Sequence, residues 1–165
     1  MLLTAEHSSL SLYSWRSGFL LRSKSTYLSD VPEGSIKLKS GTLQAIKEKK
    51  ILKGDVFPAA RLAAINAVKK ASELILLAHP IAITNVEVNL EIDEDQSAVK
   101  LTTKVKSTGK TGVEIEALMG VSVGLLTIFD MCKYLEKNEV GQYTETAISN
   151  LRVIEKNKES LESIS

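Results

Sequence analysis

The sequence predicts an α+β domain in which helices cover one face of an antiparallel sheet. Two neighbouring stretches alternate apolar and polar residues, a long apolar helical stretch follows them, and strand-like runs lie at either end. The expected order is strand, helix, helix, strand, strand, helix, strand. One helical layer over an antiparallel sheet, in this order, gives a ferredoxin-like sandwich.

The two alternating stretches are the clearest structural signal. In residues 84–92 the valines, leucine and isoleucine share one face, and residues 98–106 alternate in the same way. The polar stretch DEDQS between them predicts an antiparallel hairpin. Shorter strands are expected over residues 35–38 and 147–156.

Three helices are expected between these strands. Residues 40–50 have apolar residues at helical spacing and a basic end, and a second helix begins after Asp55, a good N-cap residue. The third helix, residues 112–137, is nearly all apolar. It contains Gly120 and Gly124 in a GxxxG pattern, which indicates close packing against a neighbour.

The two ends of the chain differ in composition from the middle. Residues 1–33 are rich in serine, with no acid between Glu6 and Asp30. Such a segment is typical of a transit peptide, or it is an extension outside the fold, which is the interpretation we favour. We therefore expect the folded domain over residues 34–157 and a polar tail over residues 158–165.

Composition excludes several classes of function. The chain is 44% hydrophobic and 25% charged, as in ordinary globular domains, and its net charge is +1. Nucleic acid and anionic membranes are therefore not expected partners. The uncharged run over residues 117–129 is shorter than the roughly 20 residues that a membrane span needs.

The metal-binding and redox-active residues are few. One cysteine, Cys132, excludes an intrachain disulfide, fits a reducing compartment and leads us to expect a cytoplasmic location. Its apolar helical surroundings predict packing rather than nucleophilic chemistry. With His7 and His79 as the two histidines, a zinc finger is excluded, and no metal or cofactor is expected.

Two glutamates flank Ile115 where the long helix begins. Thr111 and Glu114 have the spacing of a capping box, which gives Glu114 a structural explanation. Glu116 lies about 200° further round the helix and has no such explanation. We therefore expect the two acids to have different roles.

Further along this helix, Asp130 and Lys133 share a face. They form either a surface ion pair or, if partly buried, a candidate acid/base pair. Glu116 lies about 21 Å from Asp130 along the helix axis, so both cannot touch one small reaction centre in one subunit. Either the ligand is long or two subunits build each site, and the apolar helix with its two glycines favours two subunits.

Two other residues have both a plain and a functional interpretation. Lys53 precedes Gly54 at a helix start, which suits a phosphate, although an ordinary loop lysine explains it as well. His79 follows an apolar run, as a core histidine or a functional one would.

Taken together, several stretches resemble a known family. "KGDV", "LLAHP", "TGKTGVEIEAL", "DMCK" and "RVIEK", in this order and spacing, are similar to the molybdenum cofactor biosynthesis protein C family, the cyclic pyranopterin monophosphate synthases. The resemblance covers about residues 34–156. It implies a lyase that converts 3′,8-cyclo-7,8-dihydroguanosine 5′-triphosphate to cyclic pyranopterin monophosphate and diphosphate. It also implies a ferredoxin-like fold and a homohexamer, a trimer of dimers with sites at the dimer interface.

The resemblance assigns roles by motif position. The catalytic residues that it implies are Asp130, Lys133 and Lys53. The substrate-binding residues that it implies are Leu77, Ala78, His79, Glu114, Ile115, Glu116 and Lys156, and it implies no metal. We expect Glu116 to reach the substrate at a subunit boundary.

The residue types fit this chemistry. Lysines can neutralise a triphosphate, and a lysine crowded by other lysines has a lowered pKa and exchanges protons near neutral pH. The hypothesis is that Lys53 and Lys133 transfer protons and that Asp130 orients Lys133.

The chain also departs from the family pattern. Leu28 stands near the position of a family arginine, "NKESLESIS" replaces a glycine-rich end, and the loop "VGQYTETA" is longer than in some relatives. The alternative function is therefore a non-catalytic ferredoxin-like module for ligand binding or assembly. The retained lysines Lys53, Lys133 and Lys156 favour the enzyme.

Overall fold

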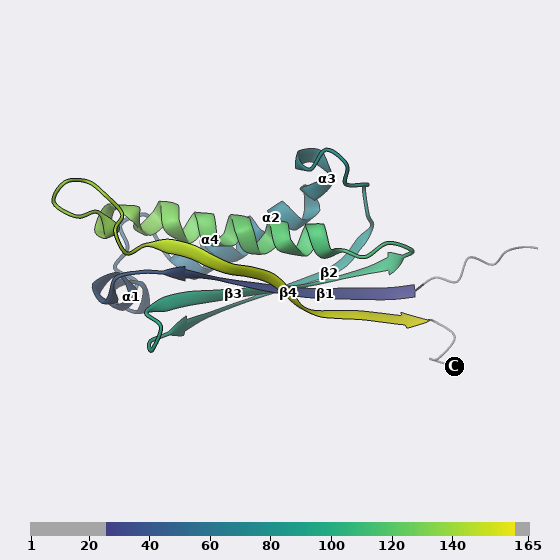
Figure 1. The fold of residues 1–165 in the computed structure, drawn as a ribbon, viewed down its shortest axis with the longest axis horizontal. Coiled ribbons are helices and arrows are strands. Elements are labelled where there is room, and N and C mark those ends of the chain that lie inside the picture. Colours follow the sequence, from purple (N-terminus) through teal and green to yellow (C-terminus); the bar gives the residue numbers. More distant parts are fainter. Residues whose placement is uncertain (1–25, 161–165) are drawn as a thin grey trace, which may run out of the picture.

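The computed structural model describes residues 26–160 of the 165-residue chain. Four antiparallel strands form one sheet in the order β2-β3-β1-β4, and the long helices α2 and α4 lie on one face of it (Figure 1). This confirms the predicted α+β ferredoxin-like class. The elements are β1 (Thr26–Lys37), α1 (Ser40–Lys47), α2 (Val56–Lys69), α3 (Ala71–Leu74), β2 (Ile83–Asp93), β3 (Ala98–Gly109), α4 (Glu114–Glu136) and β4 (Ala147–Ser160).

The β2–β3 hairpin confirms the prediction from alternation. Leu90 pairs with Leu101 in the antiparallel register, and both side chains are buried. Along β3, every second residue from Val99 to Val105 is fully buried, while the lysines between them lie on the open face. The period of two therefore places the apolar side chains of this hairpin under the helices.

The first strand is much longer than the sequence predicted. It begins at Thr26 instead of residue 35 and pairs with both β3 and β4, so it is central in the sheet. Pro32 sits at a shift in the β1–β4 register, a position that tolerates proline inside a sheet. Residues 26–33, which we assigned to the extension, thus belong to the sheet. Residues 1–25 of that extension lie outside the described residues.

The last strand also exceeds its prediction. β4 continues to Ser160, so the first residues of the expected polar tail pair with the start of β1. Residues 161–165 of that tail lie outside the described residues. Apolar and polar residues alternate only weakly in β4, because it is an edge strand that is exposed along its length.

The two helix glycines allow α4 to approach its neighbours closely. A Cβ on Gly120 would lie 2.8 Å from Val68 of α2, and one on Gly124 would lie 2.5 Å from Leu101 of β3. The predicted close packing is confirmed. Because these neighbours belong to the same chain, however, the glycines no longer support a site built by two subunits.

By length and composition alone, α4 could cross a membrane, and half of its most apolar window is buried. The core of this domain explains the apolar composition of α4, because Val121, Leu125 and Ile128 pack there with residues of β1 and β3. From the sequence we expected a stretch too short to cross a membrane, because we counted only the uncharged residues 117–129.

Cys132 lies in the same core. It is fully buried, and burial, with the nearby Glu136, raises the pKa of its thiol to about 12. This confirms the expectation that Cys132 packs rather than reacts.

Candidate functional site

At the C-terminal half of α4, one acid and two lysines form a cluster. Lys133 Nζ lies 2.7 Å from Asp130 Oδ1, and Lys53 Nζ lies 2.8 Å from Asp130 Oδ2. Lys53 also donates to the backbone oxygen of Asp130, at 3.0 Å. Each carboxylate oxygen therefore binds a different ammonium group, one from α4 and one from the loop before α2. We call these three residues the lysine cluster.

A tight turn brings Lys53 to α4. Ile51 is buried in the core, and the Gly54 amide donates to its carbonyl at 3.0 Å. Gly54 has φ +108°, a conformation that glycine adopts easily and other residues do not. Tyr134 of α4 accepts a hydrogen bond from the Leu52 amide at 3.1 Å, which fixes the loop against the helix.

Asp55 occupies the N-cap position of α2, as predicted, but it does not cap the helix. Its carboxylate pairs with Lys49 at 3.0 Å instead. Asp55 therefore lies close to Lys53 in the sequence, but it is not the acid that binds the lysines of the cluster.

The lysine cluster is open to solvent, and Asp130 and Lys133 shift each other's pKa. Lys133 first, and then Lys53, lower the pKa of Asp130 to about 2, while Asp130 raises the pKa of Lys133. The Asp130 side chain is 55% exposed. Of the two alternatives for Asp130 and Lys133, the surface ion pair is therefore the one that the structure shows. The expectation of a lowered pKa for Lys133 was wrong. The shared carboxylate outweighs the proximity of the two lysines.

A second group of predicted residues lies where α4 begins. Glu114 forms an ion pair with Lys156 of β4. The Glu114 carboxylate also lies so close to Gly112 that a Cβ there would collide with it. Glu114 and Lys156, both predicted substrate-binding residues, are therefore brought together by the fold. We call them the glutamate–lysine pair.

The predicted capping box is absent from the described structure. The N-cap residue of α4 is Val113 rather than Thr111, and Glu114 turns toward Lys156. The Val113 amide instead donates to Asp30 Oδ2 at 2.8 Å. An acid from the central strand thus replaces the local cap, because β1 runs directly beneath this turn.

Glu116 points into the molecule. It is only 4% exposed, and burial first, with Asp30 as a further cause, raises the pKa of its carboxyl group. The two glutamates do face different ways, as predicted. However, Glu114 is the acid nearer to solvent, and Glu116 does not reach the surface of the single chain.

The predicted segment around His79 lies beyond α3. His79 and Leu77 are exposed and Ala78 is half-buried, so the core-histidine interpretation is wrong. Ile115, on the first turn of α4, is 43% exposed. These side chains are available at the surface of the described chain.

The fold does not join the two groups within one chain. Asp130 lies fourteen residues after Glu116 on the straight helix α4, which is about 21 Å along its axis. The lysine cluster therefore lies near one end of the helix, and the glutamate–lysine pair lies at the other.

Sequence reasoning missed Asp30, which is 1% exposed and binds the start of α4. The signal was present, since Asp30 alternates with Leu28 and Pro32 on the helix-facing side of β1. An acid on an apolar strand face is unusual. It went unnoticed because this stretch was assigned to the extension.

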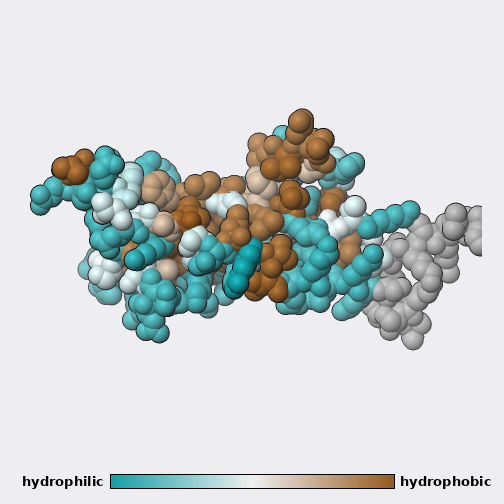
Figure 2. Space-filling model, in the orientation of Figure 1, coloured by the Kyte–Doolittle hydropathy of each residue, from teal (hydrophilic) through white to brown (hydrophobic). Residues whose placement is uncertain are grey.

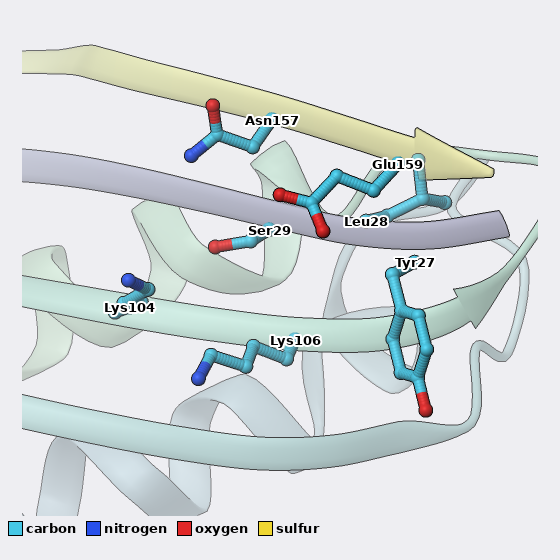
Figure 3. A pocket seen from close by; sticks show the side chains of 7 residues that line it. All are labelled: Tyr27, Leu28, Ser29, Lys104, Lys106, Asn157 and Glu159. Atoms are coloured by element: carbon cyan, nitrogen blue, oxygen red, sulfur yellow. The ribbon is translucent and has the colours of Figure 1, made fainter. Parts of the chain in front are cut away.

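A hollow of about 420 Å³ lies on the open face of the sheet, away from the helices (Figure 3). Ser29, Lys106 and Asn157, from three adjacent strands, line part of it. It contains none of the predicted site residues. Among residues 26–160, no three side chains of His, Cys, Asp or Glu come together as a metal site.

Comparison with known proteins identifies the family. The family model described as "MoaC family" matches residues 22–159, most of the chain. The chain belongs to the MoaC family. This confirms the resemblance, and the match includes residues 26–33 of β1, which the sequence analysis had left outside the domain.

Relatives in the MoaC family are close. A probable cyclic pyranopterin monophosphate synthase of Archaeoglobus fulgidus is 54% identical over 128 residues, 78% of this chain and 81% of the relative. One of Pyrococcus furiosus is 49% identical over 136 residues, covering 82% and 86%. A protein of Methanothermobacter thermautotrophicus, 53% identical over 76% of this chain and 78% of its own length, is named a probable cyclic pyranopterin monophosphate synthase accessory protein.

Proposed function

We propose that the chain is a cyclic pyranopterin monophosphate synthase, a lyase of molybdenum cofactor biosynthesis. It converts 3′,8-cyclo-7,8-dihydroguanosine 5′-triphosphate to cyclic pyranopterin monophosphate and releases diphosphate. The observation that carries this proposal is the lysine cluster, in which Asp130 holds two lysines from separate elements at 2.7 and 2.8 Å. The names of the archaeal relatives support the same activity.

The lysine cluster suits the release of diphosphate. When a substrate hydroxyl attacks the first phosphorus, a phosphorus–oxygen bond forms, the bond to the departing diphosphate breaks, and the hydroxyl proton passes to solvent. Lys53 and Lys133 place two ammonium groups where negative charge accumulates on the leaving group. The raised pKa of Lys133 favours its protonated form, so we propose that Lys133 begins as a proton donor. Asp130 orients both lysines.

The substrate-binding residues belong to the other group in this proposal. They are Leu77, Ala78, His79, Glu114, Ile115, Glu116 and Lys156. Since about 21 Å of helix separates Glu116 from Asp130, the α4 of one subunit cannot supply both halves of a site. We propose that two subunits build each site, in a homohexamer made of three dimers.

The surface of the chain supports a homo-oligomer. Apolar residues gather over α3 and the segment after it (Figure 2), where Leu74, Leu76 and Leu77 are largely exposed. Leu151 and Ile154 of the edge strand β4 are also exposed. Apolar patches of this kind mark interaction surfaces, and here they adjoin His79 and Lys156. We propose that a second copy covers them in an orientation that brings its own lysine cluster to these residues.

The cellular location forms part of the same proposal. A single buried cysteine suits a reducing compartment, so we place the enzyme in the cytoplasm. The non-catalytic assembly module remains the second candidate, favoured by the Methanothermobacter relative that is named an accessory protein.

A direct assay separates the two candidates. The assembled wild-type protein is supplied with the cyclised GTP derivative, and diphosphate and the pterin product are measured. We expect turnover by the wild type and a loss of about 100-fold or more for Lys53→Ala and for Lys133→Ala. Lys50→Ala is the matched control, because this exposed lysine lies three residues from Lys53 and pairs with Glu48. No product from a correctly assembled wild-type protein would favour the module.

A further inference from the structure

Asp30 occupies an unusual place for an acid. It lies on the central strand β1, is 1% exposed, and pairs in register with Val105 of β3 and Lys156 of β4. Its side chain is on the helix-facing side, where Oδ2 accepts the Val113 amide at 2.8 Å. A fully buried acid is costly, so its retention at this point needs a reason.

The bond to Val113 ties α4 to the sheet. The first amides of a helix lack partners within the helix and form its positive end, so a carboxylate there is favourable. In the described residues, no side chain of the helix itself or of the residues before it caps α4. The anchor comes from a residue 83 positions earlier in the sequence. The first turn of α4 is thereby fixed to β1 rather than to its own loop.

We propose that Asp30 is a positioning residue of the synthase site, which fixes the first turn of α4, and with it Glu114 and Glu116, relative to Lys156. This inference rests on the proposed function, because it gives Asp30 a role in that site. Asp30 need not touch the substrate. It acts through the two glutamates, which leave α4 within one turn of the amide that Asp30 binds.

The charges around Glu116 give a second line of support. Asp30 Oδ1 is buried and has no hydrogen-bond partner among the described residues, and Asp30 contributes to the raised pKa of Glu116. From β4, Lys156 is engaged by Glu114, and β3 contributes the uncharged Thr103, Val105 and Ser107 to this face. Asp30 therefore adds to the effect of burial and shifts the pKa of Glu116 in the direction that favours its neutral form.

Two substitutions separate anchoring from charge. Asp30→Asn keeps an oxygen that can accept the Val113 amide and removes the negative charge. Asp30→Ala removes both. Glu33→Gln is the matched control, because it removes a charge from the same strand on the open face, where Glu33 pairs with Arg152.

The first measurement follows Glu116 itself. Carbon-13 NMR of protein labelled at the glutamate carboxyl groups, assigned with Glu116→Gln, gives the titration of Glu116. We expect Asp30→Asn to lower the pKa of Glu116 and to move the matching limb of the kcat/KM profile to lower pH. A purely structural Asp30 would leave both unchanged, and unchanged titration of Glu116 in Asp30→Asn would overturn the charge role.

The second measurement follows the anchor. We expect Asp30→Ala to speed hydrogen exchange at the Val113 amide and to lower kcat/KM about 10-fold or more, with partial rescue in Asp30→Asn. Wild-type kcat/KM in a folded Asp30→Ala protein would overturn the proposal. If Asp30→Ala does not fold, Asp30→Asn and the Glu116 titration decide.

The outcomes also separate this inference from the proposed function. If the wild type forms no product, the proposed function fails. The NMR titration and the exchange of the Val113 amide still report whether Asp30 controls the first turn of α4. Conversely, if the wild type is active and the Asp30 variants behave like Glu33→Gln, the inference fails and the proposed function stands.

Discussion

Each carboxylate oxygen of Asp130 binds a different lysine, so this single residue holds the lysine cluster together. Both bonds are shorter than 3 Å, at 2.7 and 2.8 Å. Because the acid stabilises the ammonium form, Lys133 holds its proton more firmly than a free lysine. An incoming triphosphate would compete with Asp130 for both lysines, so the cluster is prepared for an anion.

Replacing Asp130 tests this arrangement. In Asp130→Asn the main cause of the raised pKa of Lys133 is gone, so we expect that pKa to fall and the neutral fraction of Lys133 to rise at any given alkaline pH. Nitrogen-15 NMR of labelled lysines measures the titration. Asp93→Asn is the control, since it should lower the pKa of its partner Lys100 and leave Lys133 unchanged. An unaltered Lys133 titration in Asp130→Asn would contradict this account.

Sequence spacing predicted only part of these contacts. The pair Asp130 and Lys133 follows from helical geometry, because residues three apart share a face. Lys53 is 77 residues from Asp130, and only the turn at Gly54 brings it into contact. Asp30 with Val113 is likewise a long-range contact. Such pairings depend on which strand lies beneath which helix, and local patterns carry no information about that.

At the scale of elements, periodicity predicted the β2–β3 hairpin and α4 well. It failed for β1, whose Pro32 and Gly34 look like loop residues. Gly34 serves another purpose, since a Cβ there would lie 2.8 Å from Val121 and 2.9 Å from Leu125. The glycine allows α4 to lie close against the central strand. Gly34 resembles a loop residue in the sequence, but the packing of α4 against β1 requires it.

The close approach of α4 to β3 should be intolerant of added volume. We expect Gly124→Leu to destabilise the protein by about 1–3 kcal/mol or more, because its first side-chain carbon would lie 2.5 Å from Leu101. Urea unfolding measures the change. Gly41→Ala is the control: in the described structure nothing lies within 4 Å of a Cβ at this helical position, so a change below about 1 kcal/mol is expected. Equal effects of the two substitutions would contradict the packing argument.

On the scale of the whole molecule, the two groups of site residues lie toward opposite ends of α4, and apolar side chains remain exposed on α3 and β4. A single chain therefore keeps the two groups apart and leaves apolar surface uncovered. The sequence predicted the distance between Glu116 and Asp130, because both lie on one straight helix. It could not predict which surface a second copy covers.

Mixed oligomers test whether two subunits build each site. Lys133→Ala and Glu114→Gln should each lose activity alone. In co-expressed mixtures, a dimer with one chain of each kind has one site with both residues intact, so roughly a quarter of wild-type turnover should return at equal amounts. Two differently tagged chains allow the mixed species to be purified and assayed. Activity that never recovers in the mixed species would show that each site lies within one chain.

The burial of Cys132 gives the protein an internal reporter. The chain has one cysteine, and its thiol ionises only near pH 12 while the core is closed. Because the thiolate is the reactive form, an alkylating reagent can modify this residue only when α4 separates from the sheet. The rate of labelling therefore measures how often the central helix opens, without any engineered probe.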